Sequence, residues 1–403
     1  MKFNMKSYRE NDHLVICLEG KITADNTDKI SAEINVLRAE NPGTCIEIDA
    51  DALEYISSAG LRMLLTLRKK QGEPLSVRNV SSDVYDVFEI TGFNSILNVK
   101  RKMREISTDG CSVIGEGSCG TVYRLDADTV VKVFKEHVSL PEIENEREMA
   151  RQAFIKGIPT AIPFDIVRVG NQYGSVFEML KATNCSDVII SEPEKMPAIL
   201  KDYADFLKSL HHIDMEPGRL PEMKMTYRQY VSEAEHLLPE NVCSRIRQLL
   251  DDMPADLHVT HGDIQLKNLM LSNGELILID MDSLSTGDPV FDFAGLFMTY
   301  KAFNEDEPDN TLNFSGLSRE TCDEIWETTL ENYFGSRDAV EFGVILDKIR
   351  LLGYLRFLHV LVAKKHGRPE LMEVRIQHTA SQLTELCGRV RDLSLKTHLF
   401  ELR

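Results

Sequence analysis

Residues 259–282 carry the pattern that most restricts how this chain can fold. The segment His261-Gly262-Asp263 follows two strand-like residues, and Asn268 comes five positions after Asp263. An apolar stretch, 276–279, then ends at Asp280. Short apolar runs bounded by turn residues are typical of buried strands. A short loop followed by such a strand therefore brings three polar side chains to one strand end.

These residue types suit the transfer of a phosphoryl group to a hydroxyl. That reaction needs one carboxylate to orient the acceptor and take its proton, together with oxygen ligands for Mg²⁺ at the ATP phosphates. We assign the first role to Asp263 and the second to Asn268 and Asp280. The alternative is a surface turn capped by Asp and Asn. We expect His261 to be a core histidine bonded to the backbone, and the pair 211–212 to end a helix.

A glycine-rich segment lies earlier in the chain. Gly115, Gly117 and Gly120 have the spacing G-x-G-x-x-G between two strand-like segments. The alternatives are a plain glycine-rich hairpin and a dinucleotide-binding turn. The latter expects a helix after the glycines, whereas residues 121–125 have strand character. A hairpin that covers nucleotide phosphates fits the pattern better.

Lys132 interrupts an apolar strand at residues 130–134. An unpaired buried ammonium is costly, so Lys132 needs anions. In a kinase-like lobe these are the α- and β-phosphates of ATP and a carboxylate from a helix. Among several acids in the next helical stretch we choose Glu146; the alternative for each is a solvated helix face. The strand that ends near Glu178 has the position of a hinge whose backbone meets adenine.

In this order, these motifs resemble the aminoglycoside phosphotransferase and choline kinase superfamily over residues 110–365. The chain has Gly262 where protein kinases usually have Arg, and Asp280-Met281-Asp282 in place of D-F-G. The resemblance implies a bilobal α+β kinase-like fold, with Asp263 as the base, Asn268 and Asp280 on Mg²⁺, and Lys132 on phosphate. It also implies that Asp292 supports the loop.

The first hundred residues have a different pattern. Residues 13–18, 45–49 and 75–80 are predicted strands. Between them, residues 28–40 form a predicted helix whose N-cap is Asn26 or Thr27. Strands that alternate with helices at this length indicate a small α/β domain.

Two hydroxyls stand where the next helix begins, in Ser57-Ser58-Ala59-Gly60-Leu61. One of them is expected to cap the helix. With the segments 18–23 and 87–93, this turn resembles the STAS domain of bacterial anti-sigma-factor antagonists over residues 5–103. The resemblance implies a regulatory phosphoacceptor at Ser58 and an anti-sigma partner. Ser57 replaces the acid that usually precedes the acceptor. A phosphate would be favoured at a helix N-terminus.

Composition narrows the partners. The net charge of −18 repels nucleic acids and anionic membranes. The eight scattered cysteines indicate neither a zinc site nor a disulfide framework. No apolar run reaches the roughly 20 residues of a membrane span, and the polar start lacks a signal peptide, so we expect a cytoplasmic protein.

We therefore predict a STAS-like domain at 1–105 and a kinase-like domain at 106–403, whose N-lobe covers about 106–180 and C-lobe about 181–403. Three functions stay open. In the first, an ATP- and Mg²⁺-dependent phosphotransferase is coupled to a STAS phospho-switch in anti-sigma-type signalling. In the second, a small-molecule kinase uses the STAS domain as a sensor. The third is a non-catalytic partner-binding protein. The sequence names neither the hydroxyl acceptor nor the oligomeric state.

Overall fold

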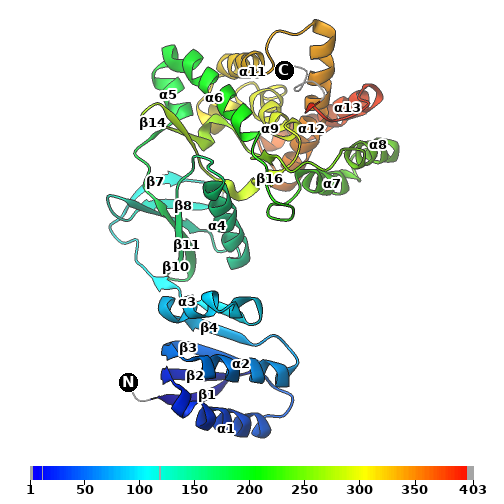
Figure 1. Cartoon of the computed structure of the whole chain (residues 1–403). Coiled ribbons are helices and arrows are strands. Elements are labelled where there is room, and N and C mark those ends of the chain that lie inside the picture. Colours follow the sequence, from blue (N-terminus) through cyan, green and yellow to red (C-terminus); the bar gives the residue numbers. More distant parts are fainter. Residues whose placement is uncertain (1–2, 11, 118, 397–403) are drawn as a thin grey trace. The chain divides into compact units, whose positions relative to one another are not determined.

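A computed structural model describes residues 3–10, 12–117 and 119–396 of the chain. It divides into two compact units (Figure 1). The first contains residues 1–107 and 166–171, and the second contains residues 108–165 and 172–403.

The first unit is built on a five-stranded sheet of order β1-β2-β3-β4-β5. The edge pair β1 and β2 is antiparallel, and the remaining neighbours are parallel. Its elements are β1 (Asn4–Glu10), β2 (His13–Ile22), α1 (Ala24–Glu40), β3 (Cys45–Ile56), α2 (Ser58–Gln71), β4 (Ser76–Val80), α3 (Ser82–Ile90) and β5 (Asn98–Arg101). A short strand, β6 (Arg104–Glu105), pairs in parallel with β10 (Pro163–Val169).

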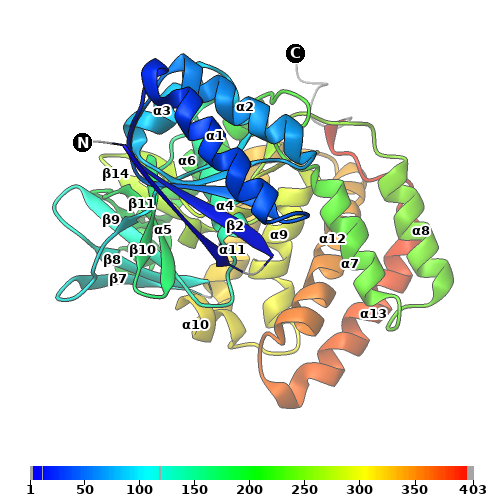
Figure 2. The same ribbon diagram turned by 90° about the horizontal axis from the view of Figure 1, so that it is seen from below.

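One face of this sheet forms the core of the first unit. Leu14, Ile16 and Leu18 alternate along β2 and are buried against the helices, with Ile30 of α1 and Leu64 of α2 in the same cluster. Figure 2 shows α1, α2 and α3 together on one side of the strands. On the opposite face Arg78 of β4 forms ion pairs with Glu47 and Asp49 of β3, so the side-chain alternation along the strands fixes which side the helices cover.

Two local predictions were wrong in this unit. Helix α1 begins at Ala24 and its N-cap is Thr23, whereas the expected caps were Asn26 or Thr27. Asn26 instead completes a capping box, because its side chain accepts from the Thr23 amide at 2.8 Å. Strand β3 continues to Ile56 rather than ending near Asp49, because its second half pairs with the end of β2.

The smaller lobe of the second unit contains antiparallel strands and one helix. Strands β7, β8, β9 and β11 are neighbours in this order: β7-β8-β9-β11. The elements are β7 (Ser112–Glu116), β8 (Gly120–Arg124), β9 (Thr129–Phe134), α4 (Leu140–Ile155) and β11 (Gln172–Glu178). Helix α4 starts with a capping box between Ser139 and Glu142.

The larger lobe of the second unit is mostly helical. Its helices are α5 (Cys185–Ser191), α6 (Met196–Leu210), α7 (Met223–Ala234), α8 (Glu240–Asp251), α9 (Val290–Tyr300), α10 (Asn310–Ser315), α11 (Arg319–Phe334), α12 (Ala339–Lys364) and α13 (Met372–Arg389). Its short strands are β12 (Thr183–Asn184), β13 (Val259–Thr260), β14 (Leu269–Ser272), β15 (Glu275–Leu278) and β16 (Ser285–Thr286).

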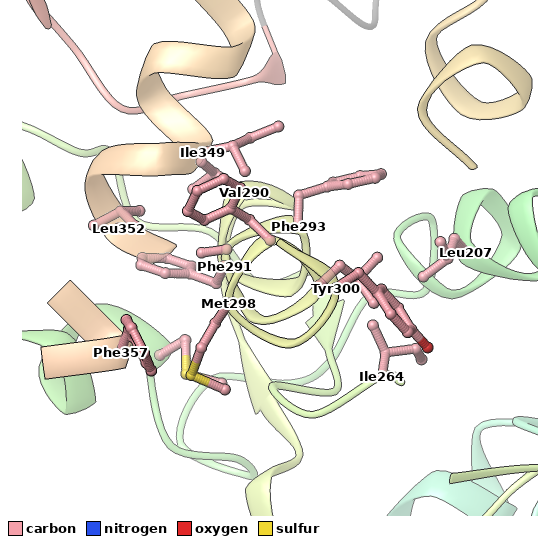
Figure 3. Close-up of a cluster of buried hydrophobic side chains, with 14 of the residues drawn as sticks. Leu207, Ile264, Val290, Phe291, Phe293, Met298, Tyr300, Ile349, Leu352 and Phe357 are labelled. Carbon is pink, nitrogen blue, oxygen red and sulfur yellow. The ribbon is translucent and has the colours of Figure 1, made fainter. Parts of the chain in front are cut away.

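Helix α9 lies at the centre of this lobe. All of its residues are buried, as expected for a helix that is apolar on every side. Figure 3 shows side chains from the helices α6, α9 and α12 gathered around it, with Tyr300 close to Ile264 of the loop after β13. Apolar side chains at helical spacing along α12, from Ile345 to Leu358, are buried in the same core. Within the described part of the chain, no helix is both long enough and apolar enough to cross a lipid bilayer.

Candidate active site

Lys132 connects three elements of the second unit. Its Nζ donates to Glu146 Oε1 of α4 at 2.7 Å and to Asp280 Oδ1, which follows β15, at 3.1 Å. The lysine side chain is 18% exposed and that of Glu146 is 11% exposed. A cation this buried is tolerated because two carboxylates face it. Among the acids of α4 considered, Glu146 is thus the one that pairs with Lys132.

The charges of this cluster support one another. Burial lowers the pKa of Lys132, but the charges of Asp280 and Glu146 outweigh burial and hold that pKa above its ordinary value. Burial raises the pKa of Glu146, and Lys132 opposes the rise. The ammonium therefore stays charged, and its position beside a strand end suits it to bind phosphate oxygens.

The three loop glycines differ in what they do. A Cβ at Gly120 would lie 2.4 Å from the carbonyl oxygen of Val133 on the neighbouring strand, so only glycine fits there. A Cβ at Gly117 would come no closer than 3.8 Å to any described atom, the nearest being the carbonyl oxygen of Gly120. Gly115 is similarly open. The fold thus requires Gly120, whereas Gly115 and Gly117 leave open the close approach of a phosphate group to the backbone.

Asp263 lies in the loop between β13 and β14, where its carboxylate is held by its own loop. Gln265 Nε2 donates to Asp263 Oδ2 at 3.0 Å, and Asn268 Nδ2 donates to the same oxygen at 3.0 Å. Asn268 Nδ2 also donates to the Asp263 carbonyl at 2.8 Å. Because this nitrogen is committed to Asp263, the amide oxygen of Asn268 is the atom that a cation could use.

Asp292, at the start of α9, holds the same loop through hydrogen bonds to its backbone amides. Its carboxylate accepts from the amides of His261 at 3.0 Å and Gly262 at 2.6 Å. His211 Nε2 lies 3.0 Å from Asp292 Oδ2, and His211 Nδ1 lies 2.8 Å from the hydroxyl of Tyr333. Burial alone would raise the pKa of Asp292, but the hydrogen bond and charge of His211 lower it below its ordinary value. The loop therefore rests on a buried anion.

Asp280 and Asp282 place two carboxylates after β15. The backbone of Asp280 is left-handed, with φ 64°, and its side chain is 41% exposed. Burial, followed by the charge of Asp280, raises the pKa of Asp282 to about 6. Two carboxylates that repel each other in this way are relieved by a cation.

Asn268 and Asp280 are chemically suited to Mg²⁺. In the residues that the structure describes, no three His, Cys, Asp or Glu side chains gather closely enough to hold a metal on their own. Mg²⁺, however, usually takes one or two carboxylates and completes its shell with water and substrate phosphates. The amide oxygen of Asn268 and the carboxylate of Asp280 fit that requirement.

Backbone hydrogen bonds limit which groups near Glu178, the predicted hinge, could meet an adenine base. The Glu178 amide donates to the Ile162 carbonyl at 3.0 Å, and the Met179 amide donates to the Asp128 carbonyl at 2.8 Å. Glu178 Oε2 also accepts from the Ile162 amide at 3.4 Å. These two amides are thus already used, and a base that met this segment would need its other backbone groups.

The predicted phosphoacceptor lies in the first unit, at the start of α2. Ser57 is the N-cap, and its hydroxyl accepts from the Gly60 amide at 3.3 Å. Ser58 is the first helical residue and is exposed. A Cβ at Gly60 would lie 2.7 Å from the side chains of Ile22 and Ile56, so the glycine brings the helix close to the strand ends.

Two long-range supports of the Asp263 loop, His211 and Arg356, were not predicted from the sequence. His211 was expected only to end its helix, and no role was assigned to Arg356, which lies in the apolar second half of α12. Arg356 Nη2 donates to Asp263 Oδ1 at 3.2 Å, and Nη1 donates to the Gly262 carbonyl. The available signal was that Arg356 is the single Asp, Glu, Lys or Arg in the apolar segment 351–363, which calls for a buried partner.

Each of the two units matches a known protein family. Residues 110–322 match the phosphotransferase enzyme family, APH, and residues 6–99 match the family described as Mlab, STAS domain. A protein of Bordetella bronchiseptica named as anti-sigma factor antagonist BtrV is 38% identical over 90 residues, which cover 21% of this chain and 76% of BtrV.

Solved structures were also compared with the chain. Aminoglycoside phosphotransferase APH(2'')-Ib, bound to ADP, is 16% identical with a TM-score of 0.45, and the match covers 75% of this chain and 98% of that one. A choline/ethanolamine kinase family protein from Mesorhizobium loti is 15% identical with a TM-score of 0.44, covering 72% and 90%.

The family matches confirm the predicted fold class, a STAS domain followed by a kinase-like phosphotransferase domain. The APH match spans more than half of the residues. This chain therefore belongs to the phosphotransferase enzyme family and carries a STAS domain as well.

Proposed function

We propose that this chain is an ATP-dependent phosphotransferase that transfers the γ-phosphate to a hydroxyl and acts in anti-sigma-type signalling through Ser58. The observation that carries the proposal is the bridge from Lys132 to Glu146 and Asp280, at 2.7 and 3.1 Å. It joins the smaller lobe to the strand end that carries the candidate metal ligand. Kinase-like sites need this lysine–glutamate pair in place.

In the proposed reaction, Lys132 binds the α- and β-phosphates beneath the loop that contains Gly115, Gly117 and Gly120. Asp263 accepts the proton of the acceptor hydroxyl while the hydroxyl oxygen forms a bond to the γ-phosphorus. The bond between that phosphorus and the bridging oxygen breaks, and ADP leaves. Asn268 and Asp280 would hold Mg²⁺, which neutralises charge on the phosphates when it is bound.

Ser58 is proposed as the regulatory acceptor in the STAS domain. It is exposed at the N-terminus of a 14-residue helix, where free amides and the helix dipole favour a phosphate. The added charge of about −1.5 to −2 would repel a docked acidic partner without unfolding the domain. Ser57 is a poorer acceptor because its hydroxyl already caps α2.

Phosphate mapping tests both parts of the proposal. The full chain, Ser58→Ala and Asp263→Asn are each incubated with Mg-ATP, and the phosphate is located by mass spectrometry. We expect phosphate on Ser58 of the wild type and none on either variant.

Other outcomes separate the alternatives. Phosphate on Ser58 only after cell extract is added would assign the modification to a separate kinase. Labelling of Ser57, or of neither serine under both conditions, would contradict the switch. ATP turnover that rises with a small metabolite would favour the small-molecule kinase with a STAS sensor.

A further inference from the structure

Arg356 places a guanidinium against the loop that holds Asp263. It lies on α12, and its side chain is 13% exposed. Nη2 donates to Asp263 Oδ1 at 3.2 Å, and Nη1 donates to the carbonyl of Gly262. One side chain thus binds both the carboxylate and the backbone that presents it.

Residue 262, which is usually Arg in protein kinases, cannot provide a guanidinium here. Gly262 has φ +79°, and a Cβ there would lie 2.5 Å from Met223 Cε and 2.9 Å from the carbonyl oxygen of Ser283. A side chain at this position is therefore excluded by both backbone conformation and space. The loop itself holds Asp263 Oδ2 through Gln265 and Asn268, and the support of Asp263 Oδ1 comes from another part of the fold, Arg356.

Gly295 of α9 makes room for that support. A Cβ at Gly295 would lie 2.8 Å from Arg356 Nη1 and 3.4 Å from the Gly262 carbonyl oxygen. Glycine in a helix interior costs roughly 0.5–1 kcal/mol relative to alanine, so its place here calls for a packing reason. The path of the guanidinium supplies that reason.

Burial of the guanidinium is consistent with a fixed ion pair. Burial lowers the pKa of Arg356, but the charge of Asp263, with smaller contributions from Tyr227 and Tyr230, raises it above its ordinary value. A planar fork holds a carboxylate with defined geometry, which the single ammonium of lysine does not. The two oxygens of Asp263 are thus held separately, Oδ1 by Arg356 and Oδ2 by Gln265 and Asn268.

We propose that Arg356 is a positioning residue that fixes the side-chain orientation of Asp263, and that Gly295 is the space it requires. The inference rests on the proposed function, because it matters only if Asp263 receives the acceptor proton. Displacement of a reacting group by about 1 Å costs on the order of 10²-fold in rate. Loss of Arg356 should therefore lower kcat and leave the KM for ATP unchanged.

The test measures a single turnover of the full chain with Mg-ATP, in which Ser58 accepts the phosphate and ADP is released; kcat is then the maximal first-order rate, and KM is the ATP concentration that gives half of it. Arg356→Met should lower kcat by roughly 10–100-fold, and Arg356→Lys should recover part of the loss. Gly295→Ala should lower kcat in the same direction, because its methyl group displaces only the end of a flexible side chain. The matched control is Gly343→Ala on α12, where a Cβ meets no described atom within 4 Å.

A double-mutant cycle distinguishes positioning from a general loss of structure. In the Asp263→Asn background, Arg356→Met should have little further effect on kcat, because the group that it orients is already disabled. An additive loss in that background, a raised KM for ATP, or an unchanged kcat in both Arg356→Met and Gly295→Ala would overturn the inference. Wild-type protein that binds Mg-ATP and forms no ADP would instead contradict the proposed function, and the role of Arg356 with it.

Discussion

The turn at Ser57–Ser58 and the loop at Asp263 both place beside a strand end a side-chain oxygen for which we propose a role in the reaction, but they are built differently. The serine turn is exposed, and its side-chain support is local: one hydroxyl caps the helix that follows. The Asp263 loop is held by Asp292 of α9 and Arg356 of α12 as well as by its own side chains, and His211, which follows α6, holds Asp292 in turn. A site that a partner must reach can be local, whereas a site that must hold one geometry needs supports from distant parts of the chain.

The largest expected effect is on the chemistry of the supported loop. Asp263→Asn keeps the shape of the side chain and removes the base, so ADP formation should fall by roughly 10²–10⁴-fold. ATP binding, measured by calorimetry, should persist because Lys132 and Asp280 are intact. Equal rates in the wild type and the variant would remove Asp263 from the mechanism.

The next effect tests the distant support directly. His211→Asn leaves the Asp292 carboxylate buried without its imidazole partner, which should cost about 3–5 kcal/mol in the free energy of unfolding. Tyr333→Phe is the matched control, since it removes only a neutral hydrogen bond worth about 1 kcal/mol. Urea unfolding at neutral pH measures both. Equal, small losses of unfolding free energy in the two variants would show that the pair of His211 and Asp292 does not stabilise the loop.

The pair of Asp292 and His211 also determines how the free energy of unfolding changes with pH. The pKa of Asp292 is lowered from 3.8, so its contribution to stability is present above that value and is lost as the pH falls through the lower, folded-state pKa. In His211→Asn the hydrogen bond and charge of His211 no longer lower the pKa of Asp292, so we expect the loss to begin at a higher pH. Urea unfolding between neutral and acidic pH measures that shift.

The glycine loop offers a smaller, matched comparison. Gly120→Ala puts a methyl group against the Val133 carbonyl and should destabilise the smaller lobe by about 1–3 kcal/mol. Gly117→Ala meets open space, so it should leave the melting temperature unchanged and weaken ATP binding. If Gly117→Ala bound ATP as well as the wild type, the loop would not approach the phosphates at that residue.

The smallest effects are expected in the exposed turn. Ser57→Ala removes the N-cap of α2 and should cost about 0.5–2 kcal/mol. Ser58→Ala should stay within about 0.5 kcal/mol, as is usual for exposed positions. Thermal unfolding of the two variants measures the difference. A larger loss for Ser58→Ala would identify Ser58 as a structural residue.

The contrast also explains what the sequence could predict. Lys132, Glu146 and Asp280 were proposed from order and residue type, and the fold brings them within hydrogen-bond distance. Their signals are local, since a lysine in an apolar strand and an acid after a strand each stand out. The cap of α1 was misassigned because Thr23 and Asn26 are both good capping residues, and only the structure shows that they act together.

Arg356 could not be assigned in the same way. Its partner Asp263 lies 93 positions earlier, and no periodicity links the two residues. The role of Gly295 depends on that contact, because nothing in its own helix marks the space that it leaves. Long-range supports of this kind follow from the packing of α9 against α12, which the sequence pattern does not encode.

The central claim is that one strand end holds the metal-bound phosphates of ATP. It is tested most directly by calorimetric titration of the full chain with ATP in Mg²⁺ and in EDTA. The wild type and Asp252→Ala, which changes an exposed aspartate at the end of α8, should bind ATP more tightly in Mg²⁺. Asp280→Ala should lose that Mg²⁺-dependent gain. Undiminished Mg²⁺-dependent ATP affinity in Asp280→Ala would contradict the account.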